Sequence, residues 1–134
     1  MRQQFPKDMR SLEDVFDFLT RFTEAEGVDS EAAFAIALAV EEFFTNMVKY
    51  SRGGNGGVAI DAMREGGRVT VRLEEHTPAP FDVTRPTKTQ FDIPVPDRRP
   101  GGLGIHLAKG LLDDLRYEYT DGTSCITLIK QLEK

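Results

Sequence analysis

The chain has 134 residues, of which 40% are apolar and 29% are charged, and its formal net charge is −5 at pH 7. The length is typical of one globular domain, the apolar fraction excludes a disordered chain, and no run approaches the ~18–20 apolar residues of a membrane span. The acidic balance is the wrong sign for a domain that coats nucleic acid or anionic lipid. The single cysteine allows no internal disulfide, and the start has no apolar segment, so we expect one cytoplasmic domain over residues 1–134.

Two helices are expected in the first part of the chain. Apolar residues recur at helical spacing after residues 11–14, which resemble a capping box, and Gly27 should end this helix. The second helix should start at Asp29 or Ser30 and continue to Tyr50, before a run of glycines. At about 20 residues it is the longest expected element and the natural spine of a core.

Shorter elements follow. Alternating apolar residues predict strands over 58–62 and 69–73, joined by a turn, and two more strands over 115–119 and 124–132. A third helix is expected from Ile105 to about Leu112. This order predicts an α+β fold: a two-layer α/β sandwich whose mixed, mostly antiparallel sheet carries helices on one face.

A proline-rich segment interrupts these elements. Six of the seven prolines lie between Pro78 and Pro100, and residues 77–103 carry a net charge of +1 within an acidic chain. Proline excludes both a helix and a central strand here. Long loops of this kind are usually lids, binding loops or disordered segments.

Two groups of residues suggest chemistry. Glu42 and Asn46 are four residues apart on the second helix and project from one side of it, with Lys49 one turn further on. An amide oxygen suits Mg²⁺ and a carboxylate can accept a proton, although the same spacing also describes a solvated helix flank. The glycine-rich residues 101–104 precede an apolar helix, where backbone N–H groups can hold a phosphate; the alternative is a simple hinge.

Two other features have plainer interpretations. Glu74, Glu75 and His76 could suggest a metal site, but an exposed strand end is the better explanation of these residues. Cys125 lies in an apolar strand without a neighbouring base, so a buried structural thiol is expected.

Taken in order, these pieces resemble the GHKL (Bergerat-fold) ATPases and are most similar to the single-domain anti-sigma factor serine/threonine kinases. Residues 39–50, with Glu42 and Asn46, are similar to the family's N box, and residues 99–107 to its glycine box. Pro80-Phe81-Asp82 resembles the Pro-Phe-Asp that follows the adenine box. The resemblance extends from about residue 16 to residue 132.

The resemblance implies a role for each matched residue. Asn46 would coordinate Mg²⁺, Glu42 would act as the general base toward a serine hydroxyl, and Lys49 would approach the phosphates of ATP or ADP. Residues 77–103 would form the ATP lid. The residues expected around the phosphates are Arg98, Arg99, Gly101, Gly102, Leu103 and Gly104.

The adenine box departs from the family pattern. Counting back from Phe81, His76 takes the place of the aspartate that accepts a hydrogen bond from the adenine amino group, and Pro78 replaces a glycine. Glu75 is expected to point to the opposite face of the strand from His76. Loss of one charge-assisted hydrogen bond of ~1.5–3 kcal/mol would weaken nucleotide binding on the order of ten- to a hundredfold.

The function that the resemblance implies is an anti-sigma regulatory factor that phosphorylates an anti-sigma antagonist protein and sequesters a sigma factor. The alternative is a non-catalytic protein-binding module on the same fold. A third interpretation is the detached ATPase domain of a histidine kinase, although no helix carrying a phosphoacceptor histidine precedes it in this sequence. The family also implies a homodimer, and Phe16, Phe18 and Phe22 offer more aromatic surface than one core-facing stripe needs.

Overall fold

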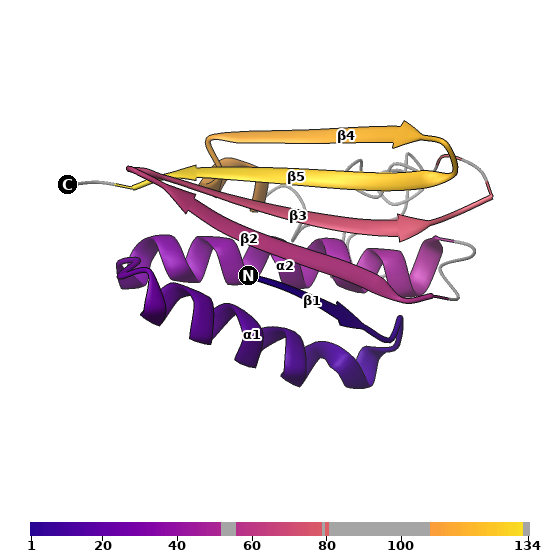
Figure 1. Ribbon diagram of the computed structural model, residues 1–134, viewed down its shortest axis with the longest axis horizontal. Coiled ribbons are helices and arrows are strands. Elements are labelled where there is room, and N and C mark those ends of the chain that lie inside the picture. The colour runs from indigo at the N-terminus through magenta and orange to yellow at the C-terminus, as the bar shows by residue number, and fades with distance from the viewer. Residues whose placement is uncertain (52–55, 79, 81–107, 133–134) are drawn as a thin grey trace, which may run out of the picture.

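A computed structural model describes residues 1–51, 56–78, 80 and 108–132. Within these ranges five strands form one antiparallel sheet in the order β1-β2-β3-β5-β4 (Figure 1). The strands are β1 (Arg2–Phe5), β2 (Val58–Glu65), β3 (Arg68–His76), β4 (Asp114–Thr120) and β5 (Thr123–Gln131). Two hairpins, β2–β3 and β4–β5, meet along the β3–β5 ladder, so residues far apart in the sequence become neighbours at the centre of the sheet.

Two helices, α1 (Leu12–Ala25) and α2 (Ser30–Tyr50), cover one face of the sheet; in Figure 1, α2 passes behind β2 and α1 lies below β1. Asp29 caps α2 as expected, because its carboxylate accepts a hydrogen bond from the Ala32 N–H at 3.0 Å. The predicted capping box of α1 is wrong. A short 3₁₀ helix, η1 (Met9–Ser11), leads directly into α1, and the Ser11 hydroxyl donates to the Pro6 carbonyl oxygen at 2.8 Å instead.

Alternation along the strands divides the sheet into two faces. In β3 the side chains of Val69, Val71, Leu73 and Glu75 are buried, while the residues between them are more exposed. We call the side that packs against α1 and α2 the inner face and the other side the outer face. The apolar core lies between the helices and the inner face, so a polar side chain on that face is also buried.

Strand β1 was not expected from the sequence. Phe5 at its end pairs with Val58 of β2 and is 1% exposed, with its ring edge-to-face against Phe18 of α1 at a centroid distance of 5.7 Å. Phe18 and Phe22 are both buried in the chain's own core. These two rings therefore give no evidence of a partner surface, and only Phe16 of the aromatic set is partly exposed.

The two-layer α+β fold with helices on one face is confirmed, as are the second helix and the four strands predicted after it. Every strand pairing among the described residues is antiparallel. Residues 108–111 are helical, at the end of the expected third helix. The start of that helix and nearly all of the predicted lid, 77–103, lie outside the described residues.

Candidate functional site

One flank of α2 carries the three polar residues that the sequence singled out. Asn46 lies in the buried stripe of the helix and is 4% exposed, although Phe43 and Met47 beside it are apolar. Glu42 is half-buried one turn before it, and Lys49 is exposed one turn after it. The helix thus presents a carboxylate, an amide and an ammonium group in successive turns, with the amide innermost.

The position of Glu42 changes its acidity. Burial raises the pKa of the Glu42 carboxyl above its ordinary value, and the neighbouring charge of Glu41 raises it further, while Lys49 opposes both effects. A carboxylate with a raised pKa is a stronger base than a free one. Glu42 is therefore suited to accept a proton.

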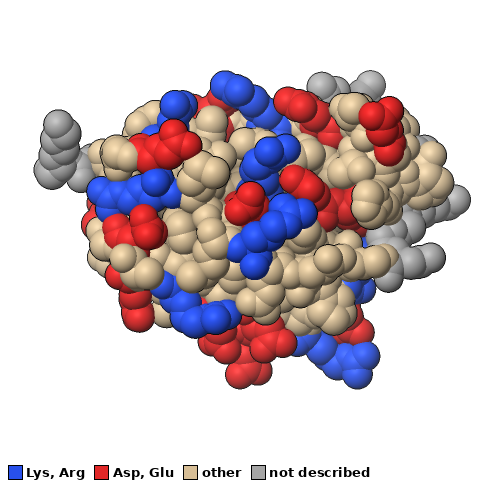
Figure 2. Space-filling model, viewed as in Figure 1, with Lys and Arg blue, Asp and Glu red and all other residues tan. Residues whose placement is uncertain are grey.

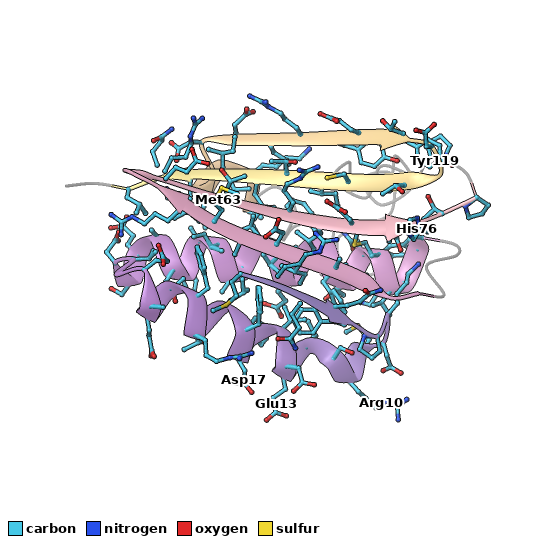
Figure 3. The ribbon with its side chains drawn as sticks, in the orientation of Figure 1. Arg10, Glu13, Asp17, Met63, His76 and Tyr119 are labelled. Carbon is cyan, nitrogen blue, oxygen red and sulfur yellow. The ribbon has the colours of Figure 1, made fainter. Side chains whose placement is uncertain are left out.

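The end of β3 lies next to the C-terminal end of α2. Glu75 is on the inner face and 3% exposed, and it lies directly opposite Ser124 of β5. His76 is on the outer face, where its Nδ1 lies 3.1 Å from the Thr123 hydroxyl; it is labelled at this end of the sheet in Figure 3. The strand register therefore puts Glu75, and not His76, on the face that packs against α2, the helix that carries Asn46.

Hydroxyl groups continue this polar corner beyond Glu75. The Thr77 hydroxyl lies 3.0 Å from that of Ser124, and both residues are buried. The Tyr117 hydroxyl lies 3.3 Å from the Ser124 hydroxyl, while the Tyr119 hydroxyl donates to the Thr77 carbonyl oxygen at 2.9 Å. Tyr119 is labelled in Figure 3 near the β4–β5 turn, at the same end of the sheet as His76. We call Ser51, Glu75, Thr77 and Ser124 the polar corner.

Glu75 is held by groups from two other elements. The Ser51 hydroxyl, at the end of α2, donates to Oε1 of Glu75. The Lys7 ammonium lies 3.0 Å from Oε2, but its hydrogen bond goes to the Ser51 carbonyl oxygen at 2.8 Å. Oε2 is buried and accepts no hydrogen bond of good geometry. A buried carboxylate oxygen in this state can still accept a hydrogen from an amino group, which fits the recognition of a purine base.

Several sequence-predicted site residues cannot be placed relative to the polar corner. Arg98, Arg99, Gly101, Gly102, Leu103 and Gly104 lie outside the described residues, as does Phe81. Of the residues that are described, the structure brings Glu42, Asn46 and Lys49 onto one helix flank and separates His76 from them by the thickness of the sheet.

The possible metal site at Glu74–His76 is not supported by the strand geometry, because Glu75 points to the inner face and its two neighbours point to the outer one. In the described part of the chain no group of three or more His, Cys, Asp or Glu residues is placed to hold a metal ion. Mg²⁺ is usually bound by one or two protein ligands together with phosphate oxygens, so Asn46 remains suited to this role.

The outer face of the sheet is a mixed-charge surface. Arg2 of β1 lies 4.0 Å from Asp61 and 3.5 Å from Glu74, and Arg72 lies 3.7 Å from Glu74. Figure 2 shows blue and red side chains interspersed over these strands. Exposed pairs of this kind add little stability, so this face is solvated rather than tightly cross-linked.

The remaining expectations concern Cys125 and the membrane. Cys125 is 8% exposed and its Sγ accepts a hydrogen bond from Arg72 at 3.3 Å, which confirms a buried thiol. Among the described helices, none has both the length and the apolar character needed to cross a membrane.

Glu75 and Ser124 were not assigned a role from the sequence. The counting from Phe81 depends on the length of a loop, whereas the face of a side chain depends only on the alternation within β3. The buried run Val69, Val71 and Leu73 already places Glu75 on the inner face, and this was the available signal.

Comparisons with known proteins agree with this fold. A family model described as "Histidine kinase-like ATPase domain" matches residues 5–130. A search of curated proteins gave no significant match. Solved structures do match, among them the RsbU and RsbW domains of Rv1364c from Mycobacterium tuberculosis, at 16% identity and a TM-score of 0.71 over 100% of this chain and 32% of that one.

A second matching structure is the histidine kinase AdeS of Acinetobacter baumannii, at 14% identity and a TM-score of 0.54. The match covers 100% of this chain and 68% of the Acinetobacter baumannii chain. This chain thus spans about a third of the Mycobacterium tuberculosis chain and about two thirds of the Acinetobacter baumannii chain. At these identities the two structures establish the fold alone.

Proposed function

This chain belongs to the histidine kinase-like ATPase domain family, and we propose that it binds ATP with Mg²⁺ and phosphorylates a serine of an anti-sigma antagonist protein. The observation that carries the proposal is the flank of α2, where the half-buried Glu42 precedes the buried Asn46 by one turn. The motif resemblance to anti-sigma factor kinases supports the antagonist and a sigma factor as partners. By the same resemblance the chain acts as a homodimer in the cytoplasm.

We assign recognition of the adenine amino group to Glu75 rather than to His76. Glu75 lies on the inner face of the sheet, which packs against the helix that carries Asn46, and its buried Oε2 keeps the capacity to accept a hydrogen bond. Ser124, opposite Glu75 on β5, offers a hydroxyl beside the same position. The departure from the family pattern is then a glutamate in place of an aspartate, together with one extra residue before Phe81.

The chemistry proposed for the α2 flank is a single phosphoryl transfer. Asn46 would hold Mg²⁺ through its amide oxygen, and the metal supplies neutralisation of phosphate charge. Glu42 takes the proton of the serine hydroxyl as the serine oxygen forms its bond to the γ-phosphorus. The bond from that phosphorus to the β–γ bridging oxygen breaks, and ADP leaves. Lys49 lies one turn away and places positive charge toward the phosphates.

Transfer of labelled γ-phosphate to a purified antagonist protein tests this function. We expect E42Q to reduce the rate by about 10²–10⁴-fold with little change in nucleotide affinity, because it removes the base but keeps the shape. N46A should weaken binding of Mg²⁺·ATP. E41Q is the matched control on the same helix, and at pH 7.5 it should stay within about twofold of the unchanged chain, because it removes a neighbouring charge but keeps the Glu42 carboxyl in place.

Two results would contradict the proposal in different ways. Phosphate transfer that persists in E42Q would remove Glu42 from its role as the base. A folded chain that binds nucleotide and captures the antagonist without transferring phosphate would instead favour the non-catalytic binding module.

A further inference from the structure

Lys7 lies outside every motif of the chain, yet it reaches the centre of the polar corner. Its ammonium is 3.0 Å from Oε2 of Glu75 and 2.8 Å from the Ser51 carbonyl oxygen. It thereby joins three elements: the segment after β1, the end of α2 and the end of β3. The side chains of Lys7 and Glu75 are 10% and 2% exposed, so this ion pair is screened from water.

The placement of Lys7 is determined by the packing of β1. Phe5, two residues earlier, is locked between its partner Val58 and the ring of Phe18. Asp8, one residue later, donates its backbone N–H to the Pro6 carbonyl oxygen at 2.9 Å, which turns the chain. With its backbone constrained on both sides, Lys7 is directed to the polar corner rather than left free at the surface.

A buried carboxylate needs compensation for its lost hydration, and breaking a buried pair by removing one partner leaves an uncompensated charge. Ser51 satisfies Oε1 of Glu75 with one hydrogen bond. Lys7 supplies the neutralising charge beside Oε2 without occupying that oxygen with a well-directed hydrogen bond. The arrangement stabilises the carboxylate in one orientation and leaves one oxygen able to accept.

We propose that Lys7 is a positioning residue for base recognition, which holds Glu75 so that its Oε2 reads the amino group of an adenine base. The inference rests on the proposed nucleotide binding. It assigns selectivity for an amino-bearing purine to a pair formed by the N-terminal segment and β3, rather than to one strand-end residue alone.

The test compares ATP with purine riboside triphosphate, which lacks the 6-amino group, by calorimetric titration at fixed Mg²⁺. The unchanged chain should prefer ATP by about tenfold or more, as expected for one charge-assisted hydrogen bond. K7M should reduce that preference to about threefold or less. A purely structural loss would weaken both nucleotides equally and leave their ratio unchanged.

Three further variants make the result specific. K7Q keeps a donor for the Ser51 carbonyl oxygen but removes the charge, so it should lose the preference for ATP as K7M does. It replaces K7M in the test if K7M does not fold. K7R keeps the charge and should retain most of the preference. R2M removes a cation of β1 that forms ion pairs on the outer face, and this variant should retain the full preference for ATP.

The outcomes separate the two proposals. If the unchanged chain binds neither nucleotide, or binds both equally, the proposed adenine recognition fails and the role of Lys7 fails with it. If the unchanged chain prefers ATP and both K7M and K7Q keep the full preference, nucleotide binding stands and the role of Lys7 is overturned.

Discussion

Substituting Glu75 by glutamine tests whether Glu75 or His76 binds the amino group of the adenine base. Glu75 is 3% exposed on the inner face, whereas His76 is exposed on the outer face. Glutamine keeps the size of the side chain and an acceptor oxygen but loses the charge. The charge-assisted hydrogen bond is worth about 1.5–3 kcal/mol, which corresponds to a rise of ~10–150-fold in the Kd for ATP.

The same substitution has a structural cost that must be measured separately. E75Q removes the partner of the Lys7 ammonium, which lies 3.0 Å from Oε2, and breaking a buried pair costs about 3–5 kcal/mol of unfolding free energy. Urea unfolding followed by circular dichroism therefore accompanies each titration, and the Kd is compared only under conditions where both chains are fully folded.

H76Q is the matched control for E75Q. The His76 ring contacts the Thr123 hydroxyl on the solvated face, so its loss should change the Kd for ATP by less than about twofold. If H76Q weakens ATP binding by tenfold while E75Q leaves it unchanged, Glu75 does not bind the adenine amino group, because the base would then be bound at the outer face.

Two further predictions concern catalysis and the fold. Burial and then the charge of Glu41 raise the pKa of Glu42, so the rate of phosphate transfer should fall tenfold per pH unit below this raised pKa, and E41Q should move this limb to lower pH. A limb unmoved by E41Q would contradict this. Gly57 and Gly66 both have positive φ angles, 86° and 59°, but only at Gly57 would a Cβ overlap the Phe5 carbonyl oxygen, so G57A should lower the urea midpoint far more than G66A. Equal midpoints for G57A and G66A would mean that this close approach of β1 to Gly57 is absent.

The long elements of the fold could be predicted from the sequence because local signals determine them. An Asp29 cap and an apolar stripe at helical spacing delimit α2, and alternation with a turn at Gly66 delimits the β2–β3 hairpin. Strand β1 could not be predicted, because its four residues carry almost no periodicity and their pairing with β2 joins residues more than fifty positions apart. Its one visible signal was Phe5, a large apolar residue just before a proline.

The candidate site was predictable in its helical half and not in its strand half. The spacing of Glu42 and Asn46 on one helix determines that they share a flank, whatever the rest of the fold. The alternation within β3 indicates the face of Glu75, but the groups that meet its carboxylate there, Ser51 and Lys7, are brought to it by tertiary packing. The contact of Glu75 with Lys7 bridges 68 positions and has no local signature in either segment.

The most direct test of the central claim is calorimetric titration of the intact chain with Mg²⁺·ATP. We expect saturable binding at one site per chain, weakened when Mg²⁺ is removed by a chelator and when Asn46 is replaced by alanine. A folded chain that shows no heat of binding with millimolar Mg²⁺·ATP would contradict the proposed function, because the buried Asn46 amide and Glu75 carboxylate would then bind no nucleotide.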